Sequence, residues 1–550
     1  MSSTVGGRLE AVERPRTLFG PDYLRLAVLA LVAVAAHGWL VGHTALTARD
    51  SLGFARLALC FENPSAAPPF ENGRPKNTLD HIREAEQPPG YPLAVWAVDV
   101  ALRSVSSRPT PDRVLLAAQL ANALAAVLLV IPTYLIGRML FTRNVGFAAA
   151  LLFQVLPVPL RITSDGLTEG VYLLATGVAI MLAVRAVRRP GIGAFLLCGV
   201  ATGASYLVRP EGLLVAAGPA AVVLYMGISR LWPRDAAFGR FVALLIGVLL
   251  VSVPYMALIG KFTNKPTGTY LNPVGDPSVP LFKGGLPVGA QRAVTGAPLF
   301  AEWWNNERDA GRSRLLWAFQ AVFKEASKSA NYVVWPLALF AVLALRRKFA
   351  TEPGLWVLSV LVGCNLALLV YLAARVGYVS ERHTVLLTML ACQLAAGGLP
   401  LLAAALGQLL PRVERLGVRI TAASLLVALV ASALPFALKP MHPQREGHKR
   451  AGLWIASHIT DNDAMIDPYN WAEWYAGRTL YRTSWNPPKS KNNYVVLENE
   501  LVKTGPHSRL PVLPEAQRLS KQSDSRIVYH WPENVPQKDA VIYVYKLGPD

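Results

Sequence analysis

The sequence predicts an all-α membrane domain that crosses the bilayer about eleven times, followed by a small soluble α/β domain. Of the 550 residues, 53% are hydrophobic and only 16% are charged, whereas soluble domains carry about 25% charged residues. The apolar residues gather in runs long enough to cross a hydrocarbon core of about 30 Å. These observations exclude an ordinary soluble enzyme and a disordered chain.

Eleven apolar spans account for about half of the first 438 residues. The first span is too long and too apolar for a cleaved signal peptide, and no A-x-A site follows it. The third is short and contains Pro157 and Pro159. The spans cover residues 24–46, 114–136, 145–161, 167–187, 193–208, 211–231, 240–260, 331–345, 354–374, 384–406 and 420–438.

The distribution of basic residues predicts the orientation. With the N-terminus inside, the tail 1–23 and the internal connections hold seventeen Lys and Arg, against four in the short external connections. Cytoplasmic loops carry this excess. We therefore expect a cytoplasmic tail, a transmembrane catalytic domain over 24–438 with external loops 47–113 and 261–330, and an extracytoplasmic domain over 439–550. The lack of an Asn-x-Ser/Thr acceptor favours a bacterial plasma (inner) membrane.

The last 112 residues differ from the membrane domain. Residues 453–459 have helical spacing, whereas 494–497 and 540–546 are strand-like, which predicts the small α/β domain. Within the first external loop, residues 91–103 form an apolar stretch too short to span. That stretch predicts a helix lying along the outer leaflet.

The net charge of +19 could indicate nucleic-acid binding. The basic residues, however, stand at the ends of apolar runs and form no block interleaved with aromatics, so we expect no nucleic-acid partner. The four cysteines are too scattered for a disulfide framework or a CxxC metal site. The residues identify no metal site and no certain cofactor.

Acidic residues mark the outer ends of two spans. Asp50 follows the first span, where a carboxylate could take a proton from an incoming hydroxyl; the alternative is a helix cap or a helix-dipole partner. Glu169 lies one turn inside an apolar helix, with Asp165 one turn before it. An ionisable group inside a span is functional by default. The alternative is an ion pair with Arg161 or Arg209.

Basic residues at the same outer ends could hold a phosphate. Arg209 and Arg382 can bind one bidentately, which lysine cannot, and Lys261 could add positive charge beside them. Tyr91, Glu211 and His383 complete the candidate set on the loop and acceptor side.

Taken together, acids and arginines beside the outer leaflet suit a substrate with a lipid tail in the membrane and an anionic head at its surface. Lipid-linked sugar phosphates have that shape. A carboxylate near the acceptor and an arginine on the departing phosphate are what inverting sugar transfer requires.

The chain resembles the integral-membrane C-type (GT-C) glycosyltransferases that use polyprenyl-phosphate sugars, in particular the bacterial protein-mannosyltransferase-like and aminoarabinose-transferase-like group. The resemblance covers nearly the whole chain. It rests on Asp50, the Pro-Pro-Gly-Tyr-Pro motif at 88–92, Glu169, the Arg-Pro-Glu-Gly motif at 209–212, Pro254-Tyr255, Glu381-Arg382 and the C-terminal domain.

This resemblance implies a glycosyltransferase, transferring a hexose or pentose from a polyprenyl-phosphate donor to an extracytoplasmic lipid, glycan or protein. It implies Asp50 as catalytic base or acceptor-binding carboxylate, Glu169 or Asp165 as second acid, and Arg209 and Arg382 at the lipid phosphate. Many members carry a second acid where this chain has Ser51, which argues against a metal site built from paired acids. A divalent metal ion stays an open alternative.

Two other classes remain as alternatives. A polytopic lipid or solute transporter or flippase should carry its acids near the midplane, on broken helices of two similar halves. Here the charges stand at outer ends, and no such halves are seen. A structural or assembly subunit would leave the intramembrane Glu169 without a purpose.

Overall fold

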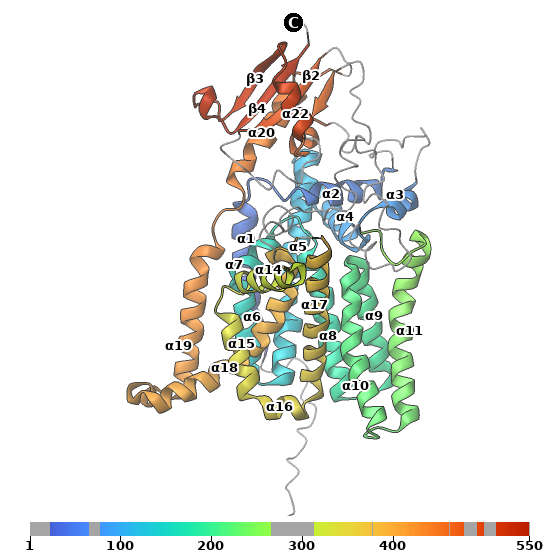
Figure 1. Cartoon of the computed structure of the whole chain (residues 1–550), viewed down its shortest axis with the longest axis vertical. Coiled ribbons are helices and arrows are strands. Elements are labelled where there is room, and N and C mark those ends of the chain that lie inside the picture. Colours follow the sequence, from blue (N-terminus) through green and yellow to red (C-terminus); the bar gives the residue numbers. More distant parts are fainter. Residues whose placement is uncertain are drawn as a thin grey trace, which may run out of the picture.

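The structure, a computed structural model, is a helical bundle with a small sheet domain at one end (Figure 1). It describes residues 22–64, 77–265, 313–376, 378–460, 463–477, 492–499 and 513–548. The predictions for the tail 1–21 and for much of the second external loop therefore lie outside the described residues.

The bundle confirms the predicted all-α polytopic domain. Among the described residues, eight helices are long and apolar enough to cross a membrane, the pair α6–α7 is bent by 66°, and α9 and α15 are shorter apolar helices. Each of the eleven predicted spans coincides with one of these elements. They are α1 (Tyr23–Gly42), α5 (Thr110–Leu140), α6 (Arg143–Val155) with α7 (Pro157–Ser164), α8 (Glu169–Arg188), α9 (Ile192–Val208), η2 (Pro210–Ala216) with α10 (Ala217–Ile228), α11 (Arg234–Ile259), α15 (Val334–Ala344), α17 (Pro353–Val376), η4 (Glu381–Thr384) with α18 (Val385–Leu409), and α19 (Pro411–Ala437).

Proline breaks the third span into two helices. Leu156 is extended and Pro157 opens α7, because the residue before a proline avoids the helical region. The predicted span 145–161 is therefore built from two helices bent by 66°. The turn 165–168 then returns the chain to α8, so that Asp165 and Glu169 lie at one end of the bundle.

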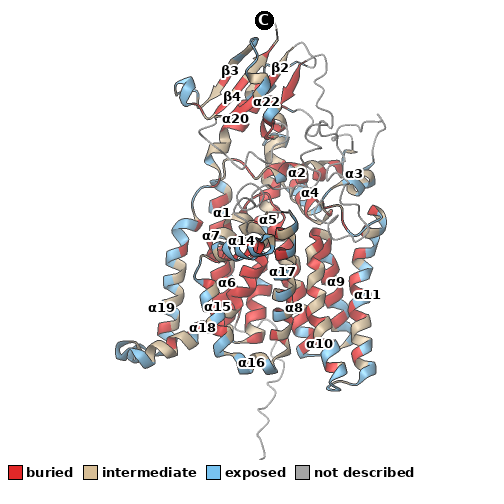
Figure 2. Cartoon of the chain, viewed as in Figure 1, coloured by how far each residue is buried: buried red, intermediate tan, exposed pale blue. Residues whose placement is uncertain are grey.

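Small residues let neighbouring membrane helices approach closely. At the crossing of α9 and α11, a Cβ on Gly199 would lie 2.2 Å from the carbonyl oxygen of Leu244, and one on Gly247 would lie 2.2 Å from that of Leu196. Such contacts are how helices pack in lipid, where burial of apolar surface gives little driving force. Figure 2 shows the buried interior of the bundle, while α19 is largely exposed along its length.

Short helices cover the end of the bundle that carries the candidate residues. The stretch 91–103 forms the helix α4 (Gly90–Arg103), which packs against α5 and α2; its place along the outer leaflet stays a prediction. Three helices were not predicted: α2 (Asp50–Cys60), α3 (Thr78–Glu84) and α14 (Arg314–Ser329). A further short helix, α16 (Arg346–Thr351), lies at the opposite end (Figure 1).

The C-terminal region folds as an α/β unit at the same end as α2 and α4 (Figure 1). Its sheet has the order β1-β2-β4-β3, parallel between β1 and β2 and otherwise antiparallel. The strand-like runs at 494–497 and 540–546 are confirmed in β2 and β4; the domain boundaries themselves stay predictions. The elements are η5 (Pro443–Arg445), α20 (Glu446–Ala456), β1 (Ala464–Ile466), α21 (Trp471–Tyr475), β2 (Asn493–Glu498), α22 (Leu513–Ser520), β3 (Ser525–Trp531), η7 (Gln537–Asp539) and β4 (Ile542–Leu547).

Candidate active site

Six charged side chains alternate in sign at the end of the bundle where α2 begins. Neighbouring members lie 2.8 to 3.6 Å apart, and each carboxylate faces one or two cations. Three carboxylates against three cations leave the group formally neutral, as burial of charge demands. We call these residues the charged cluster: Asp50, Arg382, Glu169, Arg209, Glu211 and Lys265.

Asp50 stands at the exposed edge of the charged cluster. It is the first residue of α2, and its Oδ2 accepts a hydrogen bond from Arg382 Nη1 at 2.8 Å. Its side chain keeps 46% of its surface accessible, so an incoming molecule can reach it. Desolvation raises the pKa of Asp50, but the charge and hydrogen bond of Arg382 outweigh it and hold that pKa below its usual value.

Glu169 is the buried centre of the cluster. Its Oε1 accepts a hydrogen bond from Arg209 Nη1 at 2.8 Å and lies 3.6 Å from Arg382 Nε. Its Oε2 is buried and has no hydrogen-bond partner among the described residues. The Glu169 carboxylate thus joins Arg209 and Arg382, the two arginines that the sequence predicts to bind a phosphate. The ion pair between Glu169 and Arg209, the alternative to a catalytic role for Glu169, is present in the structure.

A cavity of about 40 Å³ lies beside the cluster, between α8, η2, α17 and α18. Its lining combines charged and polar side chains with apolar ones. The charged and imidazole side chains are Glu169, Arg209, Glu211, Arg382 and His383; the leucines are Leu173, Leu368, Leu369, Leu372 and Leu386. The charged cluster therefore borders apolar side chains of α8, α17 and α18.

Lys265, rather than Lys261, supplies the third cation. Lys265 Nζ donates to both oxygens of Glu211 at 2.9 and 3.0 Å, and its side chain is 10% exposed. Lys261 lies exposed after α11, and none of its contacts in the described part of the chain reaches the cluster. Burial is the main cause that lowers the pKa of Lys265 to about 8, against the attraction of Glu211.

Asp165 lies beside the cluster and binds the turn that precedes α2. Its Oδ1 accepts from the backbone N–H of Ala48 at 2.9 Å, and its Oδ2 lies 3.4 Å from His442 Nε2. Desolvation raises the pKa of Asp165, but the hydrogen bond and charge of His442 outweigh it, so that pKa is lowered.

Asn122 on α5 fixes the junction that carries both acids. Its Nδ2 donates to the carbonyl oxygens of Ile162 at 3.0 Å and Asp165 at 2.8 Å, and its Oδ1 accepts from Gly170 N–H. A Cβ on Gly170 would lie 2.3 Å from the Asn122 carbonyl oxygen, so only glycine allows this approach. Asn122 was missed from the sequence; the available signal was an amide inside an apolar span.

Tyr91 and His383 occupy supporting positions. Tyr91 is fully buried, donates its hydroxyl to the Ala118 carbonyl oxygen at 2.9 Å, and meets the Phe54 ring edge to face at 4.9 Å. It thereby joins α4 to α5 and α2. His383 lines the cavity, and its Nδ1 accepts from the backbone N–H of Ser380 at 3.1 Å.

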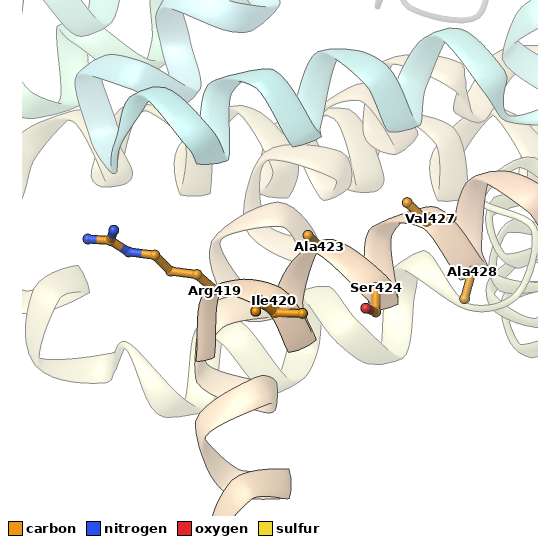
Figure 3. A pocket seen from close by; sticks show the side chains of 6 residues that line it. All are labelled: Arg419, Ile420, Ala423, Ser424, Val427 and Ala428. Carbon is orange, nitrogen blue, oxygen red and sulfur yellow. The ribbon is translucent and has the colours of Figure 1, made fainter. Parts of the chain in front are cut away.

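No group of three or more His, Cys, Asp and Glu side chains within the described ranges could hold a metal ion. A larger hollow, of about 530 Å³, runs along α19 and is lined by Ile420, Ala423, Ser424, Val427 and Ala428, with Arg419 at one end (Figure 3). Its lining carries one charged side chain and no acid. We therefore place the candidate site at the charged cluster.

Known proteins share this architecture. Residues 111–257 match the family model described as dolichyl-phosphate-mannose-protein mannosyltransferase. The structure of ArnT from Cupriavidus metallidurans bound to undecaprenyl phosphate is similar, with 13% identity, a TM-score of 0.53, and coverage of 95% of this chain and 97% of that one. A comparison with curated proteins by sequence finds no match.

The Archaeoglobus fulgidus oligosaccharyltransferase in its apo form is also similar, with 12% identity and a TM-score of 0.51 over 84% of this chain. The chain spans about 65% of the length of that protein. The archaeal AglB in complex with an inhibitory peptide and a dolichol-phosphate gives 13% identity and a TM-score of 0.50. These likenesses confirm the expected resemblance: the chain is a multi-pass membrane protein with the C-type glycosyltransferase fold.

Proposed function

We propose that the protein is a glycosyltransferase that moves a sugar from a polyprenyl-phosphate donor to an acceptor on the outer face of the membrane. The observation that carries this proposal is the charged cluster beside a cavity lined by both charged side chains and leucines. The family match over 111–257 and the similarity to structures whose titles name undecaprenyl phosphate and dolichol-phosphate support it.

Arg209 and Arg382 are proposed to hold the donor phosphate. Each guanidinium has several N–H donors in one plane, which suits two phosphate oxygens at once. In the resting state these donors face Glu169 and Asp50. A bound phosphate would compete for them and would stabilise the charge that develops as the sugar–phosphate bond breaks.

Asp50 is proposed to act as the base. The acceptor hydroxyl or amine attacks the anomeric carbon, Asp50 takes its proton, and the phosphate leaves with the electron pair of the broken C–O bond. Attack opposite to the leaving group inverts the anomeric centre. When the phosphate engages Arg382, Asp50 loses its closest counter-ion and becomes more basic, so donor binding prepares the base.

Glu169 and Asp165 are assigned supporting roles. Glu169 balances the charge of the two arginines, and Asp165 holds the turn before Asp50. Asp50 of the cluster opens α2, and α2 lies at the same end of the bundle as α4 and the C-terminal domain (Figure 1). With the cytoplasmic N-terminus that the basic residues predict, this end faces the extracytoplasmic side of a plasma membrane.

The donor site is tested by binding of polyprenyl phosphate to the solubilised full-length protein. Arg209→Lys and Arg382→Lys should each weaken binding about tenfold or more, because a loss of 1–3 kcal/mol is expected for one charged hydrogen bond. The matched control is Arg375→Lys, an exposed arginine at the end of α17; it should bind as the wild type does. Unchanged affinity in both cluster variants would remove these arginines from the donor site.

A further inference from the structure

A residue of the C-terminal region reaches the turn that precedes the candidate base. His442 follows α19 and lies directly before η5, and its Nε2 lies 3.4 Å from Asp165 Oδ2. The other oxygen of Asp165 accepts from the Ala48 N–H at 2.9 Å. Ala48 is two residues before Asp50, so one carboxylate joins the C-terminal segment to the base turn, which we define as residues 44–50.

Backbone contacts fasten the same two segments together. Thr44 forms a parallel bridge with Met441, and the Ala45 N–H donates to the Met441 carbonyl oxygen at 3.3 Å. The indole of Trp39 donates to the Leu438 carbonyl oxygen at 2.9 Å. The chain after α19 therefore runs beside the base turn along several residues.

His442 holds a conformation that its side-chain contact helps to explain. Its φ of 52° and ψ of 43° lie in the left-handed region, which non-glycine residues seldom adopt. This backbone conformation places the imidazole beside Asp165, and 26% of the His442 side chain stays accessible to solvent.

The base turn is itself closely packed on the Asp165 junction. Thr47 Oγ1 lies 2.5 Å from Ser51 Oγ, which donates to the Ala48 carbonyl oxygen at 2.5 Å. A Cβ on Gly166 would lie 2.7 Å from the Ser51 Cβ. A small shift of Asp165 would therefore be passed to the start of α2, where Asp50 faces Arg382.

The C-terminal domain fixes the other end of this connection. Lys449 Nζ lies 2.6 Å from Asp112 Oδ1, the Tyr475 hydroxyl donates to the same oxygen at 3.0 Å, and the Trp474 indole donates to the Pro111 carbonyl oxygen at 3.3 Å. The domain is thus held on the first turn of α5 while His442 contacts Asp165.

We propose that His442 is a positioning residue for Asp50, acting through Asp165 and the Ala48 N–H, so that the catalytic site is complete only with the C-terminal segment in place. This inference rests on the proposed function. It gives the C-terminal domain a role in turnover without a contact to substrate, and it assigns Asp165 to positioning rather than to proton transfer.

The test compares two substitutions at one position. His442→Asn keeps a side chain that tolerates the left-handed backbone but is too short to reach Asp165, whereas His442→Gln keeps a donor at nearly the same reach. We expect His442→Asn to lower turnover about tenfold or more with polyprenyl-phosphate affinity unchanged. We expect His442→Gln to keep most of the wild-type turnover. His458→Ala, an exposed histidine whose hydrogen bonds stay within the C-terminal domain, is the matched control.

A second measurement does not depend on activity. Hydrogen exchange of the full-length protein should show faster exchange in the base turn of His442→Asn, with the Ala48 amide most affected, while the control exchanges as the wild type does. The effects of His442→Asn and Asp165→Asn on turnover should not add.

The outcomes separate the two proposals. If the wild type transfers no sugar from any polyprenyl-phosphate donor, the proposed function fails, and hydrogen exchange still decides whether His442 holds the base turn. If exchange of residues 44–50 is unchanged in His442→Asn, the positioning role is overturned whatever the activity. Full turnover in His442→Asn would also overturn the positioning role, and so would a His442→Gln variant that turns over no faster than His442→Asn.

Discussion

Lys265 carries a charge that titrates close to neutral pH. Burial, opposed by Glu211, lowers its pKa from 10.5 to about 8, so the ammonium is present below pH 8 and is lost above it. If this charge helps to hold the donor phosphate, the KM for donor should rise about tenfold between pH 7 and pH 9, within the 1–3 kcal/mol of one charged contact. Steady-state kinetics across this range measure it.

Lys265→Arg is the control, because arginine stays charged throughout and should flatten the profile. Unfolding of the protein is not expected to explain the rise in KM between pH 7 and pH 9. Between pH 8 and 10.5 the unfolded chain binds more protons at Lys265 than the folded one, so this group makes the folded protein more stable as pH rises. If KM depends on pH in Lys265→Arg as it does in the wild type, Lys265 does not hold the donor phosphate.

The sequence identifies single charged residues in apolar surroundings as candidate site residues. It does not identify which of these residues pair with one another in the folded chain. Asp50, Glu169, Arg209 and Arg382 stand out because charge is costly inside or beside a membrane span, and the structure brings all four together. His442 carries no such signal, because its partner is 277 positions away in the sequence and only the folded chain brings them together.

At the scale of elements, the long apolar helices follow from hydropathy alone, whereas the short helices do not. α14 is amphipathic, α2 is buried or half-buried at every residue after Asp50, and both lie in segments that the sequence predicts as loops. Their register depends on the surfaces they cover: Trp317, Ala318 and Val322 of α14 are buried against α17 and α18. Tertiary packing, rather than propensity, decides such helices.

The crossing of α9 and α11 gives a test of helix packing. Gly199→Leu would place a side chain where even a Cβ lies 2.2 Å from a backbone oxygen. We expect a loss of about 1–3 kcal/mol from overpacking, measured as a lower melting temperature in detergent. Gly193→Leu on the same helix, where nothing lies within 4 Å, is the control. Equal melting temperatures for the two variants would show that this contact does not hold the bundle.

For the whole molecule, the orientation in the membrane rests on the seventeen-to-four distribution of basic residues. Ser523→Cys, on an exposed position of the C-terminal domain, should react with an impermeant maleimide in intact cells with a permeabilised outer barrier. Thr351→Cys at the opposite end, where Thr351 is the last residue of α16, should react only after lysis. The reverse pattern would place the charged cluster on the cytoplasmic side.

The central claim is that this molecule transfers a sugar from polyprenyl phosphate with Asp50 as base. The measurement is transfer from radiolabelled polyprenyl-phosphate sugars by the solubilised full-length protein and by Asp50→Asn, with a melting curve for each. Asparagine keeps the shape and much of the hydrogen bonding of aspartate but cannot take the proton. We expect wild-type turnover to fall about 10²–10⁴-fold in Asp50→Asn at unchanged melting temperature. Normal turnover by Asp50→Asn at wild-type stability would contradict the account.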